Sequence, residues 1–306
     1  MIQSALVPLD GSARSREVLT QASPLLARPG LQVELLGVVS PEDSWWEDEP
    51  PPEHQLADVR RGLVEAGRPL EDAGAFVTCS VARGDPATRI LERAAALRPS
   101  LVAMTTHGRR GPSRWLRGSV AERVLRASPA PVLLVNAASV LPSDPASERP
   151  AGGPAVRRIL VPLDGSELAA AVLPLAQEVA LAFGAELLLL RVAPFEQRDR
   201  EHEALDLAIA LSEAARAPRD AGLRVELLVG FGLPAAQILE SAEERHADLV
   251  AMATHARKGV ARWLLGSVTA EVLRACPRPL LVWPVTAAPA SGAAWRVTSG
   301  RRTGSP

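Results

Sequence analysis

The chain has 306 residues, long enough for two domains with a core each. Hydrophobic residues make up 47% and charged residues 23%, the balance of a soluble globular protein, and no apolar run reaches the roughly 18 residues of a membrane-spanning helix. The net charge of −1 gives no electrostatic reason to expect nucleic acid or an anionic membrane as a partner.

Cysteine and lysine usage exclude further classes. Cys79 and Cys276 are the only cysteines, so we expect no disulfide framework and a reducing, cytoplasmic location. The first residues, MIQSALVPLDGS, have no basic region before the apolar stretch and do not predict a signal peptide. Lys258 is the only lysine, which excludes a P-loop because that motif places its lysine beside Ser or Thr after a glycine loop.

Short apolar runs alternate with amphipathic stretches along the chain. The runs predict strands at 4–9, 32–39, 76–81, 100–105 and 131–135, and again at 158–163, 185–192, 224–230, 248–253 and 279–283. Runs that are apolar on both faces are typical of buried parallel strands. Stretches such as 15–27 and 87–97 predict intervening helices, and Pro24 and Pro174 should kink the first helix of each half. Five strands alternating with four helices in each half predict a doubly wound α/β sheet.

The chain repeats itself. ALVPLDGS at 5–12 returns as ILVPLDGS at 159–166, and WLRGSV at 115–120 returns as WLLGSV at 263–268. A repeat this long indicates a duplicated domain. We expect a first domain at 1–136, a Pro-, Ser-, Ala- and Gly-rich linker at 137–155, a second domain at 156–285 and a disordered tail at 286–306.

The two domains should pack as a pseudo-dimer within the chain. Exposed apolar edges invite pairing, so the last strands, 131–135 and 279–283, should pair with each other or with a second chain. A homodimer is thus left open. The first half also carries an acidic insertion with Trp45 and Trp46, which is interpreted as a surface patch or a lid.

The repeated stretches follow the first and fourth strands of each half, where a doubly wound sheet binds its ligand. Gly118-Ser119 opens the last helix of the first half. Ser119 could simply cap that helix, with Glu122 completing a capping box. Alternatively, the free N–H groups of the helix start could receive a phosphate, which Gly118 would allow to approach closely.

Other polar residues at these strand ends also have two interpretations. Asp10 and Asp164 could cap the first helix, or bind a ribose hydroxyl, a base edge or Mg²⁺. His107 and His255 are interpreted as polar residues at a strand end, because neither has a Cys or second His at metal-ligand spacing. Arg109 belongs to a basic loop that could be merely solvated or could screen a phosphate chain.

Four landmarks together resemble the universal stress protein family. They are VPLDGS on the first strand, GDP or GLP after the third, THG, and GSV nine residues later, and they cover most of the chain. The resemblance implies an adenine nucleotide alpha hydrolase-like fold with strand order 3-2-1-4-5. ATP-binding members carry a glycine, two residues, a second glycine, nine residues, then Gly-Ser or Gly-Thr. Thr105 and Ala253 stand at the first glycine position here, and Ala256 replaces the second glycine in the second half.

The resemblance implies an adenine-nucleotide site, for ATP or a related nucleotide, in each half. In the first half the implied site residues are Pro8, Leu9, Asp10, Val38, Met104, Thr106, His107, Gly108, Arg109, Gly118, Ser119 and Val120. In the second half, expected to be the weaker site, they are Pro162, Leu163, Asp164, Val192, Met252, Thr254, His255, Ala256, Arg257, Gly266, Ser267 and Val268. No metal is expected on the protein alone, and Mg²⁺ would accompany the nucleotide near Asp10.

The family resemblance implies a nucleotide-binding stress-response regulator or sensor, often dimeric, with weak or no ATPase activity. The alternative is a tandem scaffold that has lost nucleotide and acts through protein partners. An ATP-using enzyme ranks lowest, because no residue is placed as nucleophile or general base. The first half should bind more tightly, since Gly108 and the Ser119–Glu122 pair have no counterparts at Ala256 and Ala270. Thr105 could obstruct a ribose or hydrogen-bond to it.

Overall fold

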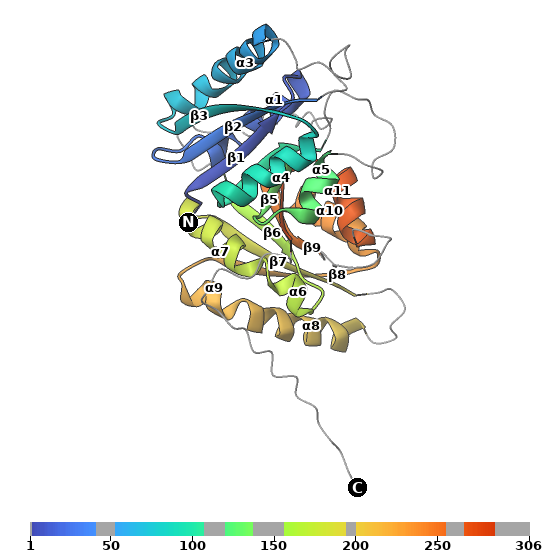
Figure 1. Cartoon of the computed structure of the whole chain (residues 1–306). Helices are drawn as coiled ribbons and strands as arrows, with labels where there is room; N and C mark the ends of the chain where they lie inside the picture. The colour runs from blue at the N-terminus through green and yellow to red at the C-terminus, as the bar shows by residue number, and fades with distance from the viewer. Residues whose placement is uncertain are drawn as a thin grey trace.

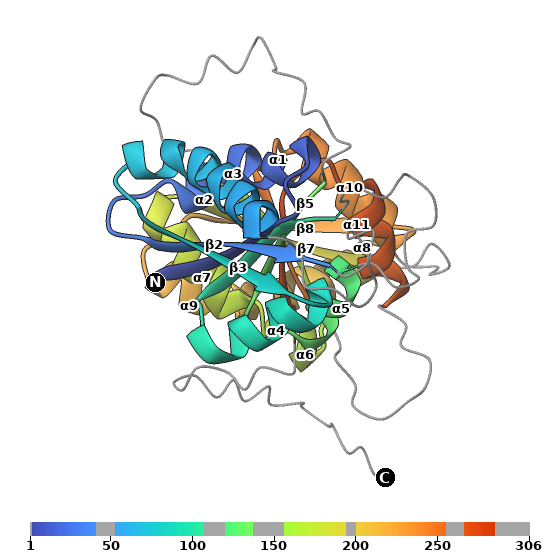
Figure 2. The same ribbon diagram turned by 45° about the horizontal axis from the view of Figure 1, so that its top comes forward.

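The computed structural model describes residues 2–40, 53–106, 120–136, 156–193, 200–254 and 266–284. The predicted linker, the tail and the Trp45–Trp46 insertion lie outside these ranges and stay predictions. Each half forms a parallel α/β unit, and together the units form a 10-stranded sheet with helices on both faces (Figures 1 and 2). Within the described ranges, no helix is both long and apolar enough to cross a membrane.

Every predicted strand is present. The first unit consists of β1 (Ser4–Leu9), α1 (Ala13–Gln21), α2 (Ser23–Leu26), β2 (Gln32–Val39), α3 (Glu53–Asp72), β3 (Phe76–Arg83), α4 (Pro86–Leu97), β4 (Leu101–Thr105), α5 (Val120–Ala127) and β5 (Val132–Val135). The second consists of β6 (Arg158–Pro162), α6 (Glu167–Ala170), α7 (Leu173–Phe183), β7 (Glu186–Ala193), α8 (Arg200–Ala214), α9 (Arg216–Asp220), β8 (Val225–Phe231), α10 (Pro234–Glu244), β9 (Leu249–Thr254), α11 (Ser267–Ala275) and β10 (Leu280–Pro284).

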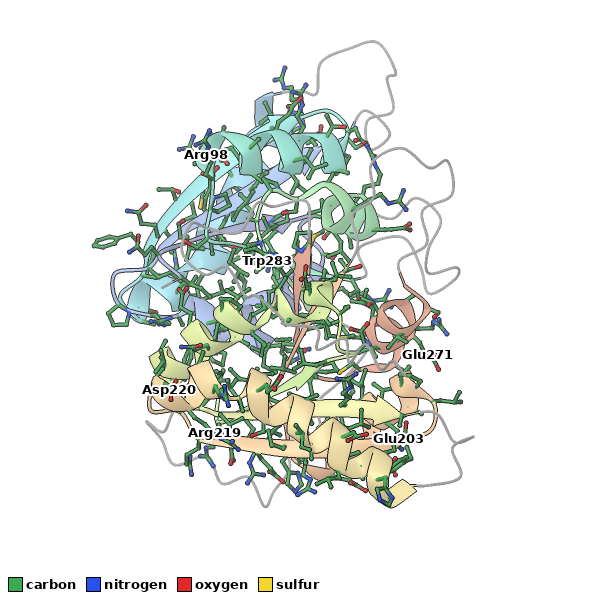
Figure 3. All side chains as sticks on the ribbon, turned by 90° about the horizontal axis from the view of Figure 1, so that it is seen from below. Arg98, Glu203, Arg219, Asp220, Glu271 and Trp283 are labelled. Carbon is green, nitrogen blue, oxygen red and sulfur yellow. The ribbon has the colours of Figure 1, made fainter. Side chains whose placement is uncertain are left out.

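The two units meet through their last strands. The strand order is β3-β2-β1-β4-β5-β10-β9-β6-β7-β8, so each half has the predicted order 3-2-1-4-5 from its outer edge inward. Strands within a unit are parallel, but β5 and β10 pair antiparallel, with Leu133 opposite Leu281. Trp283 of β10 lies in the middle of the molecule (Figure 3). The predicted pairing of the two edges is confirmed, and it covers the apolar edge that each unit would otherwise expose.

The core lies on both faces of the sheet and runs through both units. One face, the α1 face, is covered by α1–α3 and α6–α8, and its core includes Leu63 of α3 and Leu175 of α7. The other, the α4 face, is covered by α4, α5, α10 and α11, and its core includes Ile90 of α4 and Val272 of α11. Successive strand residues alternate between the faces, which fixes the face to which each candidate site residue points.

The two prolines break the first helices completely. Pro24 lies in the first turn of α2, directly after α1, and Pro174 lies in the first turn of α7, shortly after α6. Proline lacks an N–H and clashes with the preceding turn, but it is tolerated where a helix starts. The predicted kinks are therefore confirmed, in the stronger form of a helix that ends and restarts.

Candidate functional site

The winding of the sheet reverses between β1 and β4 in the first unit and between β6 and β9 in the second. Ligands of open α/β sheets bind at this point, beyond the carboxyl ends of the strands. At or near these ends the structure places Pro8, Leu9, Asp10, Val38, Met104, Thr106 and Val120, and, in the second unit, Pro162, Leu163, Asp164, Val192, Met252, Thr254, Gly266, Ser267 and Val268. Outside the described residues lie His107, Gly108, Arg109, Gly118, Ser119, His255, Ala256 and Arg257.

An apolar surface lies on the α4 face at the ends of three adjacent strands. Met104 of β4 belongs to the core of this face, and Val38 of β2 packs against that core. Pro8 lies two residues beyond Leu6, which is in the same core, so it points to the same side of β1. Met104 is buried, whereas Pro8 and Val38 are half-buried. The second unit repeats this surface with Pro162, Val192 and Met252.

Other predicted residues point to the opposite face. Leu9 and Leu163 are buried in the core of the α1 face, so only their backbone groups can reach a ligand on the apolar surface. Ala253 packs against the same α1-face core, and Thr105 follows Met104 on its strand and therefore also points there. The β-branch of Thr105 thus does not lie on the surface formed by Pro8, Val38 and Met104.

The turn after the first strand has the same two backbone-to-side-chain hydrogen bonds in both units. Asp10 Oδ1 accepts a hydrogen bond from the Ser12 N–H at 2.9 Å, and Ser12 Oγ accepts one from the Ser15 N–H at 3.0 Å. Ser12 is therefore the N-cap of α1, so the interpretation of Asp10 as the helix cap is wrong, whereas its interpretation as a ligand-binding residue stays a prediction. The intervening Gly11 has φ of +79°, which turns the chain between the carboxylate and the helix start.

The second copy of this turn repeats these contacts, so the interpretation of Asp164 as the helix cap is wrong as well. Asp164 Oδ1 accepts from the Ser166 N–H at 2.8 Å and from its hydroxyl at 2.5 Å, while Ser166 caps α6 through the Ala169 N–H at 3.1 Å. A Cβ at Gly165, whose φ is +86°, would collide with the guanidinium of Arg191. Arg191 takes the place of Gly37 of the first unit, a difference that sequence reasoning missed, and its guanidinium lies against the turn of the second unit.

The threonines at the carboxyl ends of the fourth strands, Thr106 and Thr254, differ between the units. The Thr106 N–H donates to the Val135 carbonyl at 2.9 Å, and its hydroxyl donates to the same oxygen at 3.5 Å. The Thr254 side chain is buried, and its hydroxyl has no hydrogen-bond partner within the described part of the chain. Because Thr254 lies two residues beyond Met252, it points to the α4 face of the sheet, the side of the apolar surface.

The last helix of the second unit starts without a side-chain cap. Gly266 is the N-cap of α11 and Ser267 is its first helical residue, with no side-chain capping bond. Ser119 lies outside the described residues, so the predicted capping box at α5 stays a prediction. The carboxylate of its other member, Glu122, forms an ion pair with Arg126 one turn later in α5.

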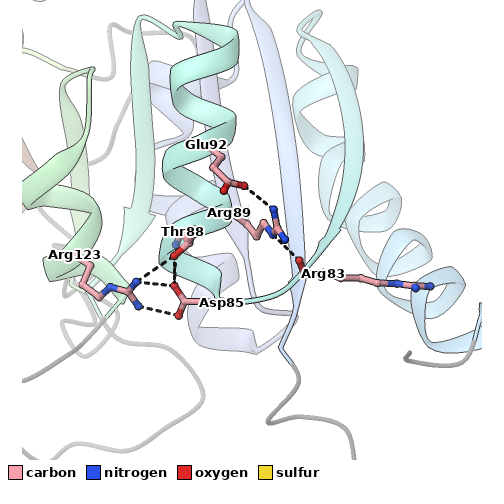
Figure 4. A network of polar contacts seen from close by, with 6 residues as sticks. All are labelled: Arg83, Asp85, Thr88, Arg89, Glu92 and Arg123. Atoms are coloured by element: carbon pink, nitrogen blue, oxygen red, sulfur yellow. Dashed lines mark hydrogen bonds and ion pairs between the residues drawn. The ribbon is translucent and has the colours of Figure 1, made fainter. Parts of the chain in front are cut away.

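A polar network at the start of α4 was not predicted. Asp85 caps α4 and forms a two-bonded ion pair with Arg123 of α5, and Thr88 joins both (Figure 4). The local signal was present in the sequence: Asp followed by Pro and, three residues on, Thr is a helix start. Nothing in the sequence pointed to Arg123 as its partner.

The described residues offer little to a metal ion. Among them, no group of three or more His, Cys, Asp or Glu side chains could hold one. Asp10 is the predicted carboxylate, and its Oδ1 is engaged in the turn. Any Mg²⁺ at this edge would therefore depend on the phosphates of a nucleotide for most of its ligands.

Comparison with known proteins agrees with this architecture. A model described as the universal stress protein family matches residues 1–136 and 155–284. A universal stress protein of Methanocaldococcus jannaschii is 30% identical over 137 residues, which span 41% of this chain and 81% of that protein.

Solved structures share this fold along nearly the whole chain. A universal stress protein from Archaeoglobus fulgidus superposes with a TM-score of 0.68 at 25% identity, covering 92% of this chain and 98% of that one. For a universal stress protein from Pseudomonas aeruginosa the TM-score is 0.61 at 20% identity, with 92% and 93% covered, which shows a shared fold.

Proposed function

Because the chain belongs to the universal stress protein family, we propose that it binds adenine nucleotide at the carboxyl edge of its sheet. We further propose that it acts as a stress-response regulator or sensor without a dedicated catalytic turnover. The observation that most supports this is one juxtaposition at the reversal of winding. The apolar surface is formed by Pro8 of β1 and by Val38 and Met104 of the neighbouring strands β2 and β4. The Asp10 turn follows the end of β1.

Each part of a nucleotide has a chemically suitable place at this edge. The adenine ring would pack on the apolar surface, and a ribose hydroxyl would donate to Asp10. The phosphates would lie at the start of α5, where unpaired N–H groups and the helix dipole favour negative charge. Gly118, two residues before Val120 in the sequence, would leave room for the phosphate oxygens.

We propose binding without turnover because the polar side chains at the ends of β1 and β6 already make hydrogen bonds within the local turns and helix caps. Asp10 and Asp164 hold their turns, and Ser12 and Ser166 cap helices. The second candidate function is a scaffold that binds protein partners and no nucleotide. It is favoured by Thr105 and Ala253, which stand where ATP-binding members have glycine.

Freshly purified protein should carry adenine nucleotide. We expect near-stoichiometric nucleotide to be released when the protein is denatured and the supernatant is chromatographed. If none is released, and calorimetric titration with ATP also detects no binding, the nucleotide proposal is wrong and the result supports the scaffold function.

The first unit should hold the tighter site. Gly118→Val would place a side chain where the phosphate is proposed, and we expect at least about a tenfold loss of affinity, about 1.4 kcal/mol. Gly266→Val is the matched variant in the second unit. A Cβ at Gly266 meets no atom of the described residues within 4 Å, so the substitution disturbs no packing among them. Calorimetry with ATP should show that Gly118→Val removes the tighter binding and that Gly266→Val leaves it. The opposite outcome would reverse the order of the sites.

A further inference from the structure

The amino ends of α4 and α5 are joined by an ion pair that is no part of the proposed nucleotide contacts. Arg123 donates from Nη1 to Asp85 Oδ2 at 2.8 Å and from Nη2 to Asp85 Oδ1 at 2.7 Å (Figure 4). A planar guanidinium that makes two parallel bonds to one carboxylate fixes direction as well as distance. The pair therefore sets how α5 lies against α4.

Asp85 also caps the helix from which it makes this contact. Its Oδ1 accepts from the Thr88 N–H at 3.0 Å and from the Thr88 hydroxyl at 2.6 Å. The bonds from Arg123 and Thr88 hold the pKa of the Asp85 carboxyl well below its usual range. A charged carboxylate is thus anchored at the rigid start of α4, and Arg123 is held against it.

The second unit has neither member of the pair. The residue corresponding to Asp85 is Leu233, which is 72% exposed and makes no side-chain capping bond to α10. The residue corresponding to Arg123 is Glu271, which lies exposed on α11 (Figure 3). The backbone framework is shared by the two units, and the link between these helices is not.

We propose that Asp85 and Arg123 are positioning residues that fix the first turn of α5 and thereby raise the nucleotide affinity of the first unit above that of the second. The inference rests on the proposed function. The described part of α5 spans only 8 residues, and a helix this short depends on tertiary contacts for its order. A helix start that is already fixed binds phosphate without a further ordering cost.

The pair can be removed without risk to the fold. The side chains of Arg123 and Asp85 are 44% and 47% exposed, and ion pairs this exposed contribute little to stability. Asp85→Asn keeps a good N-cap for α4 but removes the charge. Arg123→Ala removes the other partner. Glu92→Gln is the matched control, because it breaks the equally exposed 2.7 Å pair with Arg89 within α4, which does not involve α5.

The experiment measures the ATP affinity of the tighter site by calorimetry. Asp85→Asn and Arg123→Ala should each weaken it about fivefold, the double variant should be no weaker than either, and Glu92→Gln should leave it unchanged. Arg123→Lys should fall in between, because it keeps the charge and loses the two-bonded geometry. Introducing the pair as Leu233→Asp with Glu271→Arg should tighten the second site. Additive losses, or no loss in either single variant, would overturn the proposal.

Hydrogen exchange without nucleotide separates this inference from the proposed function. In an α-helix the amides of Val124–Ala127 donate to the carbonyls of the preceding turn, Val120–Arg123, so they should exchange several-fold faster in Arg123→Ala than in Glu92→Gln. If no variant binds ATP but these amides respond, the nucleotide function is wrong and the positioning of α5 stands. If ATP binds and these amides do not respond, the positioning role is wrong.

Discussion

Leu281→Ala is expected to lower the free energy of unfolding by about 3 kcal/mol. Leu281 lies on β10, is fully buried, and stands opposite Leu133 of β5 in the antiparallel pair that joins the units. Both side chains belong to the core of the α1 face, which contains residues of both units. The substitution would leave a cavity at this joint, where the surrounding strands are held on both sides and cannot collapse to fill it.

Denaturation with urea, followed by circular dichroism, measures this loss. Leu205→Ala is the matched control, because Leu205 on α8 is 59% exposed and its truncation should cost less than about 0.5 kcal/mol. Equal midpoints for the two variants would mean that the β5–β10 joint contributes no packing energy in solution. The described arrangement of the two units would then be wrong.

Arg93→Ala is expected to destabilise the protein by about 2–3 kcal/mol, because it leaves a buried carboxylate without its cation. Glu34 of β2 is only 7% exposed. Its carboxylate accepts from Arg93 Nε at 2.7 Å, from Arg93 Nη2 at 2.8 Å and from the Ser80 hydroxyl at 2.5 Å. The Arg93 side chain is 44% exposed, so water can partly replace its guanidinium, which keeps the expected loss below that of a fully buried pair.

The second unit supplies the control for this prediction. At the corresponding positions it carries Leu188, Leu228 and Ser241. The triple variant Glu34→Leu, Ser80→Leu, Arg93→Ser should recover the stability lost in Arg93→Ala or exceed it, since apolar replacements of buried ion pairs are often neutral or stabilising. Urea denaturation gives the free energy of unfolding of both variants. A triple variant less stable than Arg93→Ala would show that the pair itself, and not the stranded carboxylate, is what matters.

Much of the fold follows from local sequence pattern. Buried parallel strands must be apolar on both faces, and all ten such runs became strands at the expected places. The repeat predicted two units, and the exposed edge of each predicted the pairing of β5 with β10. The positions of Pro24 and Pro174 predicted where the first helices break. The boundaries of the domains and the roles of the site residues stay predictions.

The finer assignments depended on geometry that local pattern does not contain. The sequence offered Asp10 as the helix cap, but the positive φ of Gly11 moves the helix start to Ser12. Thr105 was expected to affect a ribose, but strand alternation turns its side chain to the α1 face, away from Met104. In both cases a shift of one or two residues changes which group faces the ligand edge.

The sequence by itself determined the elements, their repetition and the family, because hydrophobic periodicity and short motifs act over a few residues. Only the tertiary structure decided the polar partners. Asp85 and Arg123 are 38 positions apart, and Glu34 and Arg93 are 59 apart. Whether such side chains meet depends on how α4 packs beside α5 and over β2, and many arginines in this sequence could have served equally well. The differences between the two units therefore became visible only after the helices were placed on the sheet.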